Sequence, residues 1–214
     1  MKKLIILFIA IFIASVISKL SAQTLSIGPT GSFGHSWISN VDGDTKFNPY
    51  WNAGLSFIYS TKTSFGIGAD VKYSAEGNKR DFQTIGPADG LIDVTGTINA
   101  NYIRVPLKLI YFGGKYGNTV RPKVYVGPSF GFLTSANQIY HELNGKTKQD
   151  IKRFMKSFDF GVSAGAGLNF KLASKTWLNT DLAFYQGLSN ITKNEGRTQH
   201  NANLGVNVGL LFGL

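Results

Sequence analysis

The chain has 214 residues, a formal net charge of +10 and no cysteine. The lack of cysteine excludes disulfide bridges and cysteine-ligated zinc. The basic charge is compatible with nucleic acid or with an anionic membrane surface as a partner, and the patterns along the chain have to decide between the two.

The first 22 residues have the pattern of a secretory signal peptide. Lys2 and Lys3 precede an apolar run over residues 4–17, and a small residue, Ala22, stands at the expected cleavage point. The run is short for a membrane-spanning helix, which needs about 20 residues. We therefore expect a cleaved signal peptide over residues 1–22 and one exported domain over residues 23–214. An exported chain without a recognisable base-reading motif predicts no nucleic-acid partner.

From residue 25 onward, apolar side chains alternate with polar residues or glycine. The pattern is clearest over residues 158–170, where the apolar positions are Phe158, Phe160, Val162, Ala164, Ala166, Leu168 and Phe170. Successive side chains of a strand point to opposite faces, so such a segment has one apolar and one polar face. Long strands with this pattern are typical of membrane-spanning β-barrels.

Eight such strands are predicted, over residues 24–37, 50–60, 65–74, 98–112, 121–135, 158–170, 177–188 and 199–214. The connections after the odd-numbered strands are long and polar, with residues 76–96 and 137–156 expected as loops, and the other connections are short. The sequence thus predicts an all-β fold, an eight-stranded antiparallel up-and-down transmembrane β-barrel with short periplasmic turns and longer extracellular loops. Pro106 and Pro128 fall inside strands, where we expect a bulge or a missing ladder hydrogen bond.

Four segments also resemble the strands of a known family. Residues 101–109 resemble a "YLxIPLLLKY"-type strand and residues 126–133 a "GPSxGxL" strand, and residues 158–167 and 185–191 resemble later strands. Together they are similar to the PorT-like outer-membrane β-barrel family, most strongly from Asn101 onward. The resemblance implies an outer-membrane barrel with no catalytic residues. The family's namesake is associated with a machinery that secretes proteins across the outer membrane.

The strand pattern directs several charged side chains toward the barrel interior. They are Asp70, Lys72, Arg104, Lys108, Asp159, Lys171 and Asp181. Charges in a confined space must be paired or hydrated, and an eight-stranded barrel is narrow enough to be filled by side chains. We expect an ion-paired network that plugs the lumen, with a narrow pore as the alternative.

The predicted loop 137–156 is the second candidate site. Ile151, Phe154 and Met155 fall at helical spacing there, between the basic residues Lys148, Lys152 and Arg153. A short amphipathic helix here would rest on lipid head groups or dock a partner. The alternative is a flexible loop with incidental apolar residues.

No constellation in the sequence indicates catalysis or metal binding. His35 and His200 fall at the loop ends of the first and last strands, but no third ligand is evident for a metal. No set of nucleophile, base and acid is visible. We therefore predict no enzyme activity, no cofactor and no metal site.

The predicted function is a structural or interaction role in the outer membrane, in protein secretion or envelope assembly by analogy. The expected partners are outer-membrane lipid and lipopolysaccharide, together with envelope or secretion-machinery proteins. Two alternatives stay open at this point. One is a secreted, soluble, lipocalin-like ligand binder with its apolar face inward, and the other is a narrow solute pore. The oligomeric state is left open.

Overall fold

A computed structural model describes residues 24–214 except 42, 62, 86–90, 143–144 and 195. The expected signal peptide lies outside the described residues, so it stays a prediction. The elements of the described chain, in order, are β1 (Thr24–Ile38), β2 (Asp44–Lys46), β3 (Pro49–Ser60), β4 (Phe65–Ile85), β5 (Leu91–Phe112), β6 (Val120–Glu142), β7 (Gly145–Asp150), the short 3-10 helix η1 (Lys152–Phe154), β8 (Phe158–Ala173), β9 (Thr176–Gly187) and β10 (Asn201–Gly213). In this part of the chain no helix is long and apolar enough to span a membrane.

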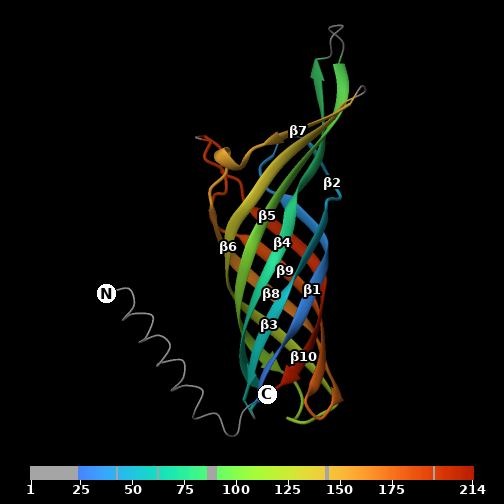
Figure 1. The fold of residues 1–214 in the computed structure, drawn as a ribbon, viewed down its shortest axis with the longest axis vertical. Helices are drawn as coiled ribbons and strands as arrows, with labels where there is room; N and C mark the ends of the chain where they lie inside the picture. The colour runs from blue at the N-terminus through green and yellow to red at the C-terminus, as the bar shows by residue number, and fades with distance from the viewer. Residues whose placement is uncertain (1–23, 42, 62, 86–90, 143–144, 195) are drawn as a thin grey trace, which may run out of the picture.

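Eight of the strands form a closed antiparallel ring (Figure 1). The ring runs β1–β3–β4–β5–β6–β8–β9–β10, and it closes because β1 pairs with both β3 and β10. Ser26 of β1 lies opposite Gly213 of β10, so both ends of the barrel chain meet at the end with the short turns. This arrangement confirms the predicted up-and-down barrel.

Apolar side chains face outward around the ring, and polar side chains face inward. Leu107 and Val206 are 42% and 58% exposed, whereas Arg104 and Asn207 are 5% and 4% exposed. An apolar outer band around a polar interior is what a barrel in lipid requires. A soluble lipocalin-like barrel would have the reverse arrangement, so that alternative is wrong.

Three strands continue well beyond the ring at the end opposite the short turns. β4, β5 and β6 are 21, 22 and 23 residues long, and Figure 1 shows them projecting past the rest of the barrel. Two short strands flank this extension, with β2 paired to β4 and β7 paired to β6. We refer to the projecting parts of β4, β5 and β6, with β2 and β7, as the extension.

The loops predicted over residues 76–96 and 137–156 are a wrong prediction, because most of both segments forms strands of the extension. Lys79 pairs with Thr97 and Phe82 with Val94, so the β4–β5 ladder continues through most of the first segment. In the second segment β6 runs on and turns back into β7, whose six residues are all exposed. The alternation of apolar and polar residues weakens here because polar residues such as Lys79 and Arg80 are partly exposed and β7 is fully exposed, while the backbone hydrogen bonds persist.

The β5–β6 ladder is interrupted at the two prolines without a change of register. Pro106 lies opposite Ser129 and Leu109 opposite Val126, with no pairs between them. A register shift occurs instead between Asn101 and Tyr102. At the interruption Gly127 comes close to the neighbouring strand, since a Cβ atom there would lie 2.2 Å from the Leu107 carbonyl oxygen. Missing pairs, rather than a bulge, therefore accommodate the prolines.

Candidate functional site

The middle of the lumen contains a carboxylate held by two lysines. Asp70 of β4 is fully buried, and its Oδ2 lies 2.9 Å from Lys72 Nζ and 2.5 Å from Lys108 Nζ. Ser56 donates a hydrogen bond to Asp70 Oδ1 at 2.7 Å. The charge of Asp70 is thus satisfied by donors from three strands, β3, β4 and β5, as burial of a charge requires.

Asn207 of β10 links this cluster to a second ion pair. Its Oδ1 accepts a hydrogen bond from Lys72 Nζ at 3.0 Å, and its Nδ2 donates to Asp181 at 3.3 Å. Asp181 in turn lies 3.0 Å from Lys123 Nζ. Two hydroxyl groups of β1 also donate to Asn207 Oδ1, from Thr30 at 3.1 Å and Ser32 at 2.9 Å. A single network therefore crosses the barrel from β4 and β6 to β9, β10 and β1.

Nearer the extension, Arg104 is held between two carboxylates. Its Nε and Nη2 donate to the two oxygens of Glu76 at 2.5 and 2.6 Å, and Nη2 also donates to Asp159 at 2.9 Å. The guanidinium carbon lies 4.9 Å from the centre of the Tyr102 ring and 3.9 Å from that of Tyr185. Paired and stacked in this way, the guanidinium is fixed across the lumen.

Apolar clusters close both ends of this polar interior. The cluster near the short turns consists of Ile58, Ile110, Phe112, Tyr125 and Leu211, with Trp177 packed against it. The cluster at the opposite end consists of Ile38, Ala100, Tyr102, Leu133, Ala136, Met155 and Ile191. One lumen pocket of about 40 Å³ lies among the charged residues, and one of about 30 Å³ lies at the cluster near the short turns. Each has room for a water molecule or little more. Side chains fill the lumen that the structure describes.

Six of the seven predicted lumen charges lie in these networks, and Lys171 does not. The two-residue period directs Lys171 inward, but the residue lies at the end of β8, opposite Trp177 and next to a register shift. Its Nζ lies 5.8 Å from the Trp177 ring, and the side chain is only partly buried. Lys171 therefore lies nearer the short turns than the ionic networks do. The two-residue period of the strand alone does not reveal this position.

Two charged members of the networks, Glu76 and Lys123, are not among the predicted lumen charges. Glu76 falls in a segment expected as a loop, although it continues the inward parity of Asp70 and Lys72 along β4. Lys123 is not among the predicted lumen charges, although it alternates with the outward Val124 and Val126 on β6. Extending the two-residue period beyond residue 74 finds Glu76, and applying it within the predicted strand 121–135 finds Lys123.

The short amphipathic helix expected in the segment 137–156 does not form in the part of it that the structure describes. Lys148 lies on the exposed β7, and η1 is a single 3-10 turn that places Phe154 outward, 50% exposed, and Met155 inward, 7% exposed. Lys152 Nζ donates to the Thr134 carbonyl at 2.7 Å. The apolar residues do not share one helical face, because Met155 pairs with Thr192 across the end of the barrel.

The two rim histidines have separate partners. His35 Nδ1 lies 3.2 Å from the Asn48 carbonyl oxygen, and its ring stacks against Trp37 and Phe47. His200 Nδ1 lies 2.9 Å from the Ser189 carbonyl oxygen. The described residues contain no group of three side chains suited to hold a metal ion.

The sequence and the fold were compared with known proteins. Residues 21–193 match the family described as "Outer membrane protein beta-barrel domain". A search of curated proteins gives no match. Among solved structures, a major outer membrane protein from Thermus thermophilus is 12% identical with a TM-score of 0.56, covering 90% of this chain and 100% of that one.

Two further solved structures have lower scores. Neisserial surface protein A is 9% identical with a TM-score of 0.49, covering 87% of this chain and 96% of that one. The attachment invasion locus protein Ail of Yersinia pestis is 12% identical with a TM-score of 0.37, covering 89% and 97%. The Thermus protein thus supports the barrel fold at low sequence identity.

Proposed function

Because this chain belongs to the outer-membrane β-barrel family and lies in the outer membrane, we propose that it is a non-enzymatic, non-conducting barrel with a structural or interaction role. The observation that carries this proposal is the filled lumen. The two ionic networks occupy its middle, and the apolar clusters occupy its ends. The charged side chains of the interior are paired with one another, and these pairs hold neighbouring strands together.

Conduction would require the ionic networks to separate. Arg104 would have to leave both Glu76 and Asp159 within a confined, low-dielectric space. Breaking a buried ion pair costs about 3–5 kcal/mol when one partner loses its counter-charge. A path for ions would also have to pass Phe112 and Met155 in the apolar clusters at the two ends.

The extension is the part of the molecule suited to interaction. It stands beyond the lipid-facing band, and exposed basic side chains gather around this end of the barrel: Lys46, Lys146, Lys148, Lys152, Arg153, Lys156 and Lys193. Such charges attract anionic head groups, so outer-membrane lipid and lipopolysaccharide are the first partners in this proposal. Envelope or secretion-machinery proteins are further partners by the PorT-like resemblance. Arrival by a cleaved signal peptide belongs to the same proposal.

Planar-bilayer recording tests the proposal. The purified chain, with insertion checked by heat-modifiable gel mobility, is expected to give no steady current across the bilayer. Steady, large single-channel currents would overturn it and favour the narrow solute pore instead. Lipid release or acyl transfer by the same preparation would contradict the non-enzymatic part of the proposal.

A further inference from the structure

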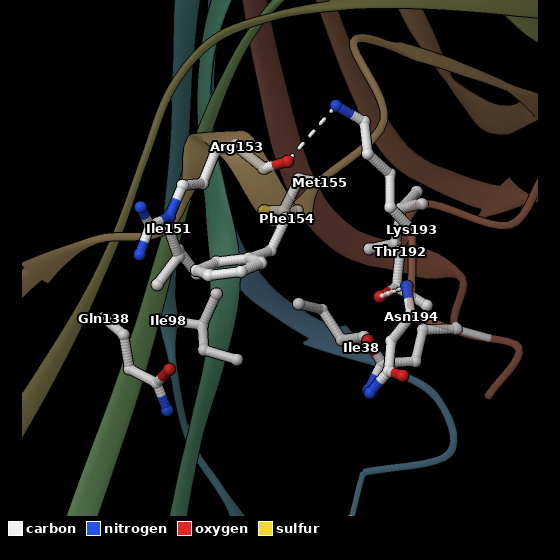
Figure 2. A pocket seen from close by; sticks show the side chains of 12 residues that line it. Ile38, Ile98, Gln138, Ile151, Arg153, Phe154, Met155, Thr192, Lys193 and Asn194 are labelled. Carbon is white, nitrogen blue, oxygen red and sulfur yellow. Dashed lines mark hydrogen bonds between the residues drawn. The ribbon is translucent and has the colours of Figure 1, made fainter. Parts of the chain in front are cut away.

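A pocket of about 520 Å³ lies at the end of the barrel that carries the extension (Figure 2). One wall is formed by residues 151–155 and 191–194, which we call the cap. The other is formed by Ile38 of β1 with Ile98 and Gln138 of β5 and β6. The pocket has the size of a site for one small organic molecule, about 300–1,000 Å³. It lies outside the sealed lumen, so a ligand bound in it would go beyond the proposed function.

Backbone hydrogen bonds fix the cap in place. The Ile151 amide donates to the Ala136 carbonyl at 3.1 Å, which ties the start of the cap to β6. The Lys193 amide donates to the Phe154 carbonyl at 2.9 Å, which joins the two halves of the cap. The pocket is therefore a preformed cavity, and a ligand would not have to order its walls.

The floor of the pocket is apolar. Ile38 of β1 and the cap residues Met155 and Ile191 belong to the buried apolar cluster at this end of the barrel, and the partly buried Ile98 and Ile151 pack against that cluster. None of these five side chains carries a polar group that needs a hydrogen-bond partner. A hydrocarbon chain laid against the partly exposed Ile98 and Ile151 and the exposed Phe154 would gain about 25 cal/mol for each Å² of apolar surface removed from water.

Two cations stand at the mouth of the pocket. The guanidinium carbon of Arg153 lies 4.6 Å from the centre of the Phe154 ring, and Lys193 Nζ donates to the Arg153 carbonyl at 3.2 Å. Figure 2 shows the Arg153 guanidinium beside Ile151, above Ile98 and Gln138, and the Lys193 amine at the other side of the cap, near the Arg153 carbonyl. None of the twelve described residues that line the pocket is acidic. The two positive charges at the edge of the pocket are thus not balanced by an acidic side chain among its described lining residues.

We propose that this pocket binds a free, single-chain amphiphile with an anionic head group, such as a medium-chain carboxylate. The chain lies against the apolar side chains of the pocket, and the anionic head group is attracted by the positive charge of Arg153 and Lys193 at its edge. A lipid with several acyl chains is too large for this volume, and a neutral hydrophobe leaves the two cations unused.

Met155 provides a direct probe, because the sequence contains only one other methionine, Met1. The full chain, labelled with ¹³C-methyl methionine, is placed in lipid nanodiscs, and Met155→Leu assigns the resonance. Sodium decanoate is then titrated at low salt, with butyrate and decanol as comparison probes. We expect a saturable shift of the Met155 methyl signal with decanoate, at least about tenfold weaker binding of decanol, and no saturable shift with butyrate.

Two charge-matched variants separate the pocket from general surface attraction. Arg153→Gln with Lys193→Gln should weaken decanoate binding at least about tenfold and leave decanol binding unchanged. Lys146→Gln with Lys148→Gln removes the same charge from β7, outside the pocket, and should leave decanoate binding unchanged. The proposal is overturned by the absence of a saturable shift, by equal binding of decanol and decanoate, by butyrate binding as well as decanoate, or by equal loss in both double variants.

Discussion

Arg104 and Glu76 form a two-fold hydrogen-bonded ion pair inside the barrel, although they are not neighbours across the β4–β5 ladder. Arg104 lies opposite Lys72, and Glu76 lies opposite Ala100. The guanidinium therefore reaches along the barrel axis to the carboxylate, with Nε and Nη2 at 2.5 and 2.6 Å from its oxygens. The pair joins the membrane-spanning part of β4 to the beginning of the extension.

The first prediction concerns this pair. Glu76→Gln should lower the free energy of unfolding by about 3 kcal/mol, because Arg104 then keeps only one of its two counter-charges in a buried site. Urea unfolding in lipid vesicles measures the change. Asp81→Asn, on the same strand, is the matched control, since its partner Lys46 is about half exposed. We expect no measurable change there, and an equal effect of the two substitutions would contradict the buried-pair account.

The second prediction concerns the close approach of β5 and β6 at the prolines. Gly127→Ala should destabilise the barrel by about 1–3 kcal/mol, because the new methyl group would collide with the Leu107 carbonyl. The heat-modifiability midpoint on gels should fall accordingly. Gly145→Ala in β7 is the control, since nothing lies within 4 Å of a Cβ atom there. An unchanged midpoint for Gly127→Ala would show that the strands do not approach this closely.

The third prediction tests which face meets lipid. Val206 lies near the middle of β10 and is 58% exposed. Val206→Arg should destabilise the folded barrel in vesicles by about 2–4 kcal/mol, the cost of a lipid-facing arginine near the bilayer centre. Val206→Leu should be nearly neutral. If arginine were tolerated as well as leucine, the outer face at this position would not be in hydrocarbon.

The fourth prediction concerns export. N-terminal sequencing of the protein from the outer-membrane fraction should begin at Gln23, because Ala22 is the small residue at the expected cleavage point. Ala22→Arg should block cleavage and leave a longer product. A wild-type product that begins at Met1 would contradict the signal peptide.

The ring was predictable because lipid imposes a pattern on its strands. Leu107 and Val206 had to be apolar and Arg104 and Asn207 polar, so a two-residue period was visible and the strand count could be derived from it. The extension had no such constraint. In β7, residues such as Lys148 form a ladder without an apolar face, and in the projecting part of β4 polar residues such as Lys79 interrupt the alternation. Backbone hydrogen bonds leave no mark in the side-chain pattern.

The lumen was predictable only in part, for a related reason. The period tells which way a side chain points, and it correctly directed Asp70 and Asp159 inward. It does not tell the height of a residue along the barrel, so Lys171 was included although it lies beside Trp177 near the turn. The pairing of Arg104 with Glu76 depends on the register and on the length of β4, which the sequence did not reveal. The cap was hidden for the same reason, because the Met155–Thr192 contact joins segments far apart in the chain.

The place of Asn207 in the network has a consequence for assembly. This residue comes from the last strand, and its partners Thr30, Lys72 and Asp181 come from the first strand of the ring, from the third, and from the one before the last. A partly inserted set of hairpins would leave these groups unsatisfied in hydrocarbon. Joining β10 to β1 thus completes the hydrogen bonds around Asn207, and we expect closure of the cylinder to be coupled to insertion into the bilayer.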